Sequence, residues 1–154
     1  MTKYVVAPAT VEHALELAPV MRKEDTREVW AGAHYTPEVA LLTSMAGSPE
    51  PVSWLADDRV LYMCGVGEFP GMKDQGVPWG LGARELPKHS RPFLRFSRNF
   101  ILDVAPRYRQ LLNFVDARHT VAIRWLGWLG FKLWPVQPLG PENLSFHMFT
   151  MDRT

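Results

Sequence analysis

The sequence predicts a single α+β domain over residues 1–154, with a mixed, mostly antiparallel and twisted sheet flanked by helices in an α/β/α arrangement. Two observations carry this prediction. A chain of 154 residues suits one hydrophobic core, which would bury roughly 70% of the surface that the unfolded chain exposes. The expected order of elements, β-αα-βββ-α-β-α-ββ, combines an antiparallel meander with two late strand–helix crossovers, and few folds do so.

The first third of the chain predicts one strand and three helices, over residues 4–7, 10–19, 25–33 and 36–47. Thr10 and Thr36 are placed to cap the first and third of these helices, because a threonine hydroxyl accepts from the free N–H groups of a first turn. Pro19 bends or ends the first helix. In the second helix we expect Val29 and Trp30 to face the core.

From Pro51 onward the pattern changes to strands, expected over residues 52–56, 60–66, 77–83, 111–115, 133–136 and 144–151. The Asp57-Asp58 pair predicts a tight turn, so the first two strands form a hairpin. A long helix follows, which Ser90 caps and Pro106 stops. Its apolar residues recur at helical spacing and predict a core face, formed by Phe93, Phe96, Phe100, Ile101 and Val104.

Charge and cysteine content exclude several classes of protein. The net charge of +1 gives no electrostatic case for nucleic acid or an anionic membrane as the main partner. The basic segment 84–98 is interpreted as a solvated helix face. Cys64 is the single cysteine and cannot form an internal disulfide, which favours a reducing, intracellular compartment. No run approaches 18 apolar residues, so no membrane span is expected.

The stretch HTVAIRWLGWLGF, residues 119–131, predicts an amphipathic helix that ends at a glycine. It resembles the last helix of the GNAT acetyltransferase superfamily, in which an asparagine is followed by alanine, an aliphatic residue, tyrosine and a closing Gly-Phe. The residues that occupy those places in this chain are His119, Ala122, Trp125, Leu126, Gly130 and Phe131. The order of elements agrees with the same superfamily over nearly the whole chain.

Two departures from the superfamily pattern concern the chemistry. Leu126 stands where a tyrosine commonly protonates the departing thiolate of coenzyme A, and leucine has no proton to give. The connection ARELPKHSRPF lacks the glycines that let backbone N–H groups converge on a pyrophosphate, and Gly80 and Gly82 lie earlier, in the preceding strand. The resemblance therefore allows acetyl-CoA without requiring any cofactor. The candidate cofactor-binding residues are Lys88, His89, Ser90 and His119, with a solvated loop and a local helix cap as the alternatives.

Other catalytic arrangements are weaker, and the catalytic residues stay unassigned. The five histidines have no metal-ligand spacing, so no metal site is expected. Neither a nucleophile elbow nor a phosphate-binding glycine loop is present. Glu68 and Asp116 are the carboxylates that we considered as general bases, against ordinary loop or capping roles.

The segments VAPAT, LAPVMRKEDTREVWAG and TPEVALLTS are similar to those of a narrower group, the GNAT-like proteins of short-tailed bacteriophages related to internal virion protein A. This resemblance implies a virion-associated or assembly protein without turnover, whose partners are other phage virion or assembly proteins. It would be located in the host cytoplasm during infection and could be incorporated in the virion. The alternative is an acetyl-CoA-dependent N-acetyltransferase that acts on a host or virion amine.

Six tryptophans are a high number for this length, and tryptophan is enriched where protein surfaces meet. We expect most of them to lie in the core and one or two to be contact residues. Trp128 falls near the boundary of the apolar stripe in its helix. The sequence thus predicts a partly exposed aromatic surface near the closing strands, which could bind a partner or a second copy of the chain.

Overall fold

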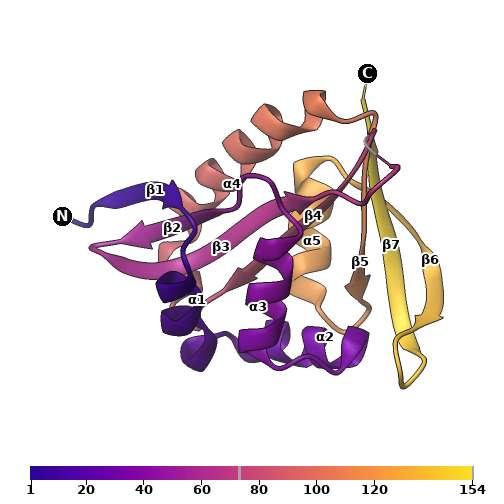
Figure 1. Cartoon of the computed structure of the whole chain (residues 1–154), viewed down its shortest axis with the longest axis horizontal. Helices are drawn as coiled ribbons and strands as arrows, with labels where there is room; N and C mark the ends of the chain where they lie inside the picture. The colour runs from indigo at the N-terminus through magenta and orange to yellow at the C-terminus, as the bar shows by residue number, and fades with distance from the viewer. Residues whose placement is uncertain (73, 154) are drawn as a thin grey trace.

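A computed structural model describes residues 1–72 and 74–153, which form one sheet with helices on both faces (Figure 1). The strands are β1 (Tyr4–Pro8), β2 (Val52–Ala56), β3 (Arg59–Gly67), β4 (Gln75–Gly82), β5 (Gln110–Asp116), β6 (Lys132–Leu139) and β7 (Leu144–Asp152). The helices are α1 (Val11–Leu17), α2 (Lys23–Ala33), α3 (Pro37–Ala46), α4 (Ser90–Val104) and α5 (Thr120–Leu129). None of the helices in the described ranges is long and apolar enough to cross a bilayer.

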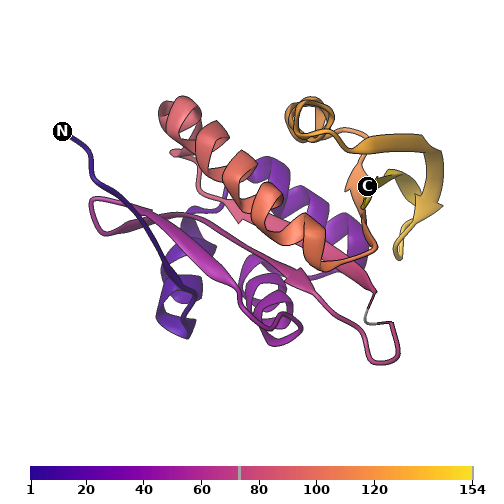
Figure 2. The same cartoon turned by 90° about the horizontal axis from the view of Figure 1, so that it is seen from above.

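The described residues form a seven-stranded sheet with the strand order β1-β2-β3-β4-β5-β7-β6. The sheet is mixed and mostly antiparallel, as the sequence predicted. Every neighbouring pair is antiparallel except β4 and β5, which are parallel. Helices α1 and α3 cover one face, whereas α4 and α5 cover the other (Figure 2). The resulting α/β/α arrangement confirms the predicted fold class.

Strands β4 and β5 separate soon after they meet, and this separation positions the site. Their backbone register holds only where Gln75 faces Gln110 and Gly76 faces Leu111. Beyond that point one side chain bridges the gap, because the Asn113 amide donates to the Pro78 carbonyl at 2.7 Å. The two strands therefore form a V that opens toward their carboxyl ends.

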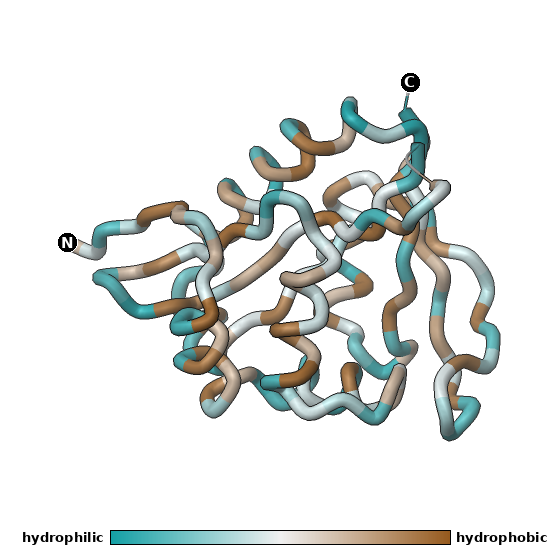
Figure 3. The backbone as a smooth tube through the Cα atoms, in the orientation of Figure 1, coloured by the Kyte–Doolittle hydropathy of each residue, from teal (hydrophilic) through white to brown (hydrophobic). Residues whose placement is uncertain are grey.

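The core fills both faces of the sheet. On one face Leu17 and Leu41, from α1 and α3, pack with Met63 and are fully buried. On the other face α4 and α5 enclose a second apolar group that includes Leu111 and Val115 of β5. Apolar and polar residues alternate along the turns of α4 (Figure 3), as expected of a helix that buries a single stripe.

Local predictions about helix ends and turns are confirmed. The hydroxyls of Thr10 and Thr36 accept from His13 N–H at 3.1 Å and from Val39 N–H at 3.3 Å, in the first turns of α1 and α3. Asp57 and Asp58 adopt positive φ angles of 47° and 65°, as a two-residue hairpin turn requires. These features depend on neighbours in sequence and are therefore readable from it.

Two local predictions are wrong. Trp30 was expected to face the core but is 49% exposed and stacks on His34. The inward face of α2 carries Asp25 and Glu28, and Trp30 lies about 200° around the helix from Glu28. Ser90 does not cap α4, because a 3₁₀ turn over Leu86–His89 runs directly into the helix and Ser90 is already its first residue.

Candidate functional site: a polar cleft between β4 and β5

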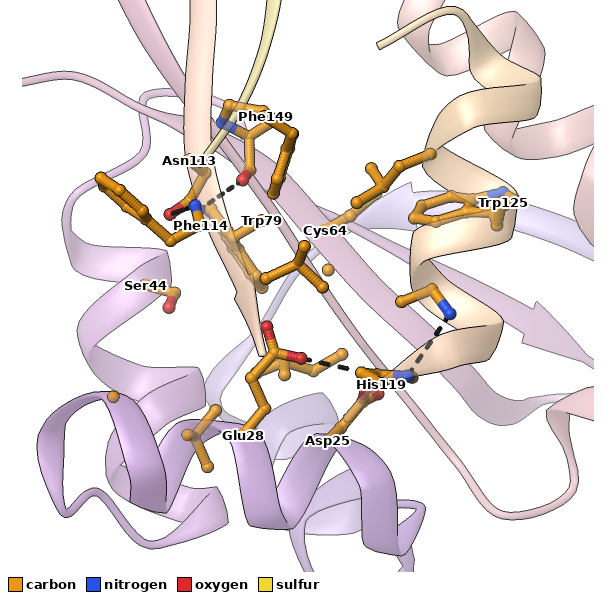
Figure 4. Close-up of a pocket in the computed structure, with 18 of the residues that line it drawn as sticks. Asp25, Glu28, Ser44, Cys64, Trp79, Asn113, Phe114, His119, Trp125 and Phe149 are labelled. Atoms are coloured by element: carbon orange, nitrogen blue, oxygen red, sulfur yellow. Dashed lines mark hydrogen bonds and ion pairs between the residues drawn. The ribbon is translucent and has the colours of Figure 1, made fainter. Parts of the chain in front are cut away.

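The V between β4 and β5 contains a cleft of about 360 Å³ (Figure 4). Its walls are largely aromatic, and Trp79, Phe96, Trp125 and Phe149 contribute to them. A second set of lining side chains carries polar groups and comes from α2, β3, β5 and the start of α5: Arg22, Asp25, Glu28, Tyr62, Asn113 and His119. An apolar cleft with a few convergent polar groups is the usual form of a small-molecule site.

Helix α2 lies across the open end of the V and supplies the acidic groups. Asp25 and Glu28 are three residues apart, so both project from one face of α2 toward the start of α5 (Figure 4). Asp25 also lies in the first turn of α2, where a carboxylate is favoured by the helix dipole. The local sequence thus places two carboxyl groups side by side at the mouth of the cleft.

Asp25 is the centre of a buried hydrogen-bond network. Its Oδ2 accepts from Arg22 Nε at 2.7 Å and from the Gly82 N–H of β4 at 2.8 Å. Its Oδ1 lies 2.8 Å from His119 Nε2. Burial alone would raise the pKa of Asp25, but the hydrogen bonds from His119, Arg22 and Gly82 together favour the ionised form more strongly, and the pKa is lowered.

His119 is the N-cap of α5 and is 2% exposed. Its Nδ1 accepts from the Ala122 N–H at 3.4 Å. Since that nitrogen is an acceptor, the ring hydrogen lies on Nε2 and is donated to Asp25. Both ring nitrogens are therefore engaged, and His119 supports the network at the wall of the cleft.

Glu28 is the acidic group of the cleft whose charge is least balanced by nearby hydrogen-bond donors. Its Oε2 lies 3.9 Å from His119 Nε2, and its side chain is 23% exposed. Burial, followed by the neighbouring charge of Asp25, raises the pKa of Glu28 to about 8. A carboxyl group that titrates near neutral pH in a cleft is a candidate for proton transfer.

The same three side chains form the one possible metal-ligand cluster found in the described residues. The candidate ligand atoms of Asp25, Glu28 and His119 all lie within 4.8 Å of one another. Sequence spacing could not indicate this group, because His119 is 94 residues from Asp25. However, His119 Nε2 carries a hydrogen and Arg22 already neutralises Asp25, so the geometry is that of a hydrogen-bonded network.

The other candidate cofactor-binding residues gather at the start of α4, outside the lining of the cleft. Lys88 and Ser90 are exposed. The ring of His89 lies 2.7 Å from Tyr4 Oη and 3.1 Å from Glu85 Oε2. Hydrogen bonds from Arg59 and His89 lower the pKa of Glu85 to about 2, so an ionised carboxylate lies beside this helix end. The structure thus brings Lys88, His89 and Ser90 together and places His119 in the cleft.

Glu68 and Asp116, the carboxylates that the sequence offered as general bases, are occupied elsewhere. Glu68 accepts from Tyr108 Oη at 2.5 Å at the end of β3. Asp116 is 1% exposed and binds the Arg118 guanidinium at 2.7 Å. Neither lines the cleft. The polar residues that line it and that sequence reasoning missed include Arg22, Asp25, Glu28, Tyr62 and Asn113. For Asp25 and Glu28, the i, i+3 spacing of two acids on α2 was the available signal.

No protein-family model and no curated protein matches the sequence. Solved structures do match. An N-acetyltransferase from Staphylococcus aureus Mu50 gives a TM-score of 0.74 at 13% identity, with 97% of this chain and 98% of that chain covered. A GNAT-family acetyltransferase from Streptococcus pneumoniae gives 0.65 at 10% identity, with 98% and 100% covered. RimL, an acetyltransferase of a ribosomal protein solved with coenzyme A, gives 0.69 at 8% identity, with 97% and 93% covered.

These likenesses extend over essentially the whole chain. The protein therefore has the GNAT acetyltransferase fold, which the sequence pattern of residues 119–131 had indicated. Identities of 8–13% establish the fold alone.

Proposed function

We propose that the chain is an N-acetyltransferase that transfers an acetyl group from acetyl-CoA to an amine in the cleft between β4 and β5. The observation that carries the proposal is Glu28, a carboxyl group with its pKa raised to about 8 in an aromatic cleft at the opening of the V. A base with a pKa near the working pH is effective in proton transfer. The acetyltransferases among the structural neighbours, one of them with coenzyme A bound, support the choice of reaction.

The acyl end of such a donor fits the residues present. Within the described residues, β4 pairs with no strand on the side that faces β5 beyond Gly76, and the Asn113 amide donates to the Pro78 carbonyl across the gap. An extended ligand with amide groups can pair with a free strand edge of this kind. The thioester supplies an activated acetyl group, while the aromatic walls exclude water around it.

The start of α4 fits the pyrophosphate of coenzyme A less well. The helix has no side-chain cap, which leaves N–H groups of its first turn without a side-chain acceptor. Pro92 contributes no N–H, and the Arg59 guanidinium near this helix end is already paired with Glu85. Lys88 offers a side-chain cation in place of a glycine loop. We therefore expect coenzyme A to bind weakly, with most contacts in the cleft.

The side chains at the mouth of the cleft have separate tasks in this proposal. The Glu28 carboxylate accepts a proton from the amine as the nitrogen attacks the acetyl carbon. Burial raises the pKa of Glu28, and the negative charge of Asp25, which Arg22 and His119 keep ionised, raises it further. Glu28 thus acts on the substrate, while Asp25 and His119 position the helix that carries it.

The proposal is tested by calorimetry with acetyl-CoA and desulfo-CoA, followed by a thiol-release assay with a panel of amines and peptides. We expect a Kd near or above about 100 μM, which corresponds to about −5.5 kcal/mol. Glu28→Gln should bind the donor equally well but lower kcat by about 100-fold. Absence of turnover by the wild type, with every amine and at saturating donor, would contradict the proposal.

A second candidate function is a phage virion-associated or assembly protein that keeps the fold without turnover. Leu126 in place of the tyrosine, together with Glu85 and Pro92 at the start of α4, favours it. Trp128, which is 49% exposed, offers a contact residue for another virion protein or a second copy of the chain. On this hypothesis the protein is made in the host cytoplasm and enters the particle, and quantitative mass spectrometry of purified particles tests it.

A further inference from the structure

We propose that Tyr62 of β3 is a catalytic residue that donates a hydrogen bond to the departing thiol sulfur, in place of a group at position 126 of α5. The inference rests on the proposed acetyl transfer. Leu126 occupies the position from which the superfamily resemblance implies a tyrosine, and it is packed into the apolar group under α5. The hydroxyl that α5 lacks is provided to the same cleft by a different strand.

Two glycines of β4 create the space for the Tyr62 ring. Tyr62 faces Gly82 in the β3–β4 register, and Gly80 follows on the same face. A Cβ atom on Gly80 would lie only 1.6 Å from Tyr62 Oη, and one on Gly82 would lie 3.2 Å from its Cδ1. The ring therefore lies across β4 in a furrow that any side chain at position 80 would fill, and this arrangement explains the WGLG stretch of β4.

Aromatic contacts fix the ring in this furrow. Phe93 of α4 packs edge-on against Tyr62 with ring centroids 4.8 Å apart, and Phe96 approaches at 6.5 Å. Tyr62 is 4% exposed as a whole residue. A ring held between α4 and the glycines of β4 presents its hydroxyl in one direction, across β4 and into the cleft.

The Tyr62 hydroxyl has no hydrogen-bond partner in the described part of the chain. Ser53 Oγ is the one fully enclosed side-chain polar atom there that is left unpaired, so the Tyr62 oxygen is open to the cleft. Buried tyrosine hydroxyls usually find a partner. An unpaired hydroxyl on a fixed, buried ring that faces a cleft points to a ligand atom as its missing partner.

The protonation state of Tyr62 suits a hydrogen-bond donor. Burial raises its pKa well above the usual range, and the nearby Cys64 adds to the effect. The phenol is therefore protonated throughout the physiological range. Cys64 also lines the cleft, but burial raises the pKa of its thiol as well, so it does not compete as a nucleophile at neutral pH.

In the transfer step, Glu28 acts at the amine nitrogen and Tyr62 acts at the thiol sulfur. The amine nitrogen forms a bond to the acetyl carbon and gives one proton to the Glu28 carboxylate. The carbon–sulfur bond breaks, its electron pair stays on sulfur, and the Tyr62 hydroxyl stabilises the thiolate by a hydrogen bond. The thiolate then takes a proton from solvent as Glu28 releases one. The net change is one proton moved from nitrogen to sulfur, without an oxidant or reductant.

The test compares wild type, Tyr62→Phe and Tyr108→Phe with two acetyl donors. Tyr108 is a matched control, a buried tyrosine that hydrogen-bonds Glu68 outside the cleft. With acetyl-CoA we expect Tyr62→Phe to lose about 100-fold in kcat with little change in KM, and Tyr108→Phe to retain activity. With an acetyl thioester of an acidic aromatic thiol, whose thiolate needs no such hydrogen bond to leave, the loss for Tyr62→Phe should shrink to a few-fold.

The outcomes separate this inference from the proposed function. If Tyr62→Phe turns over both donors like the wild type, the role of Tyr62 is overturned while acetyl transfer stands. If it loses equal activity with both donors, the hydroxyl acts on a step other than departure of the thiol, and the role is again overturned. A wild type without turnover overturns acetyl transfer itself. Circular dichroism of Tyr62→Phe, which keeps the ring in its furrow, checks that the variant is folded.

Discussion

His119 and Asp25 are joined at 2.8 Å across 94 residues of sequence, and their contact ties α5 to α2 at the open end of the cleft. The His119 ring also caps α5 through its other nitrogen, and Asp25 also binds the Gly82 N–H of β4. One hydrogen-bond network around the Asp25 carboxylate therefore links α2, β4 and α5 at the site.

Removal of the His119–Asp25 contact should lower the free energy of unfolding. His119→Ala leaves the buried Asp25 carboxylate without one donor and α5 without its cap, so we expect a loss of roughly 2–4 kcal/mol in the free energy of unfolding. Val121→Ala, at a position 58% exposed on the same helix, is the control and should cost far less. Urea unfolding measures both, and equal effects would show that the network contributes nothing.

Glu28 should give the protein a stability that falls as pH rises. Its folded pKa of about 8 lies above its ordinary value of 4.5, so between these values the folded state keeps a proton that the unfolded chain releases. The stabilising contribution is complete below about pH 4.5 and is lost as pH rises through about 8. Relative to Glu28→Gln, the wild type should lose roughly 4 kcal/mol between pH 5 and pH 9. Glu38→Gln, an exposed control, should leave the pH profile unchanged.

Gly140, in the β6–β7 turn, should not accept a side chain. Its φ of +78° disfavours other residues, and a Cβ would lie 2.1 Å from the Ala31 carbonyl oxygen of α2. We expect Gly140→Ala to destabilise by roughly 2 kcal/mol or more. Gly127→Ala is the control, since nothing lies within 4 Å of its added Cβ in α5, and it should stabilise slightly. Thermal unfolding measures both changes: the melting temperature should fall for Gly140→Ala and rise slightly for Gly127→Ala.

Trp128 should contribute little to folding. It is 49% exposed on α5, with the Arg98 guanidinium 6.0 Å from the ring centroid. We expect Trp128→Ala to change stability by less than about 1 kcal/mol, whereas Trp54→Ala, at a position 3% exposed, should cost roughly 3–5 kcal/mol. If Trp128→Ala is as destabilising as Trp54→Ala, its exposed ring is not free for a partner.

Restoring a tyrosine at position 126 should not raise activity. Leu126 is 5% exposed and packs with Leu111 and Phe149, so a larger polar side chain overpacks that group. We expect Leu126→Tyr to lose roughly 1–3 kcal/mol in stability without any increase in thiol release. Val121→Tyr, at an exposed position of the same helix, controls for folding. A rise in turnover with Leu126→Tyr would show that α5 can still supply the acid.

The sequence by itself determined the features that depend on near neighbours. Threonine caps at Thr10 and Thr36, the Asp57-Asp58 turn and the Gly130 stop of α5 each follow from one or two residues and their backbone preferences. Hydrophobic periodicity then ordered the elements, and that order was sufficient to predict the fold class. Periodicity alone did not orient α2, because a polar inward face such as that of Asp25 and Glu28 carries no apolar signal, and Trp30 was assigned to the wrong side.

Only the tertiary structure decided the candidate site. The separation of β4 from β5 results from the packing of whole elements, and it brings α2 to the start of α5, where Asp25 meets His119. The direction of the Tyr62 hydroxyl depends on the register of β3 against β4, which sets the ring over Gly80. Proximity between residues far apart in sequence, and the pKa shifts that burial imposes on them, arise only when the chain has packed.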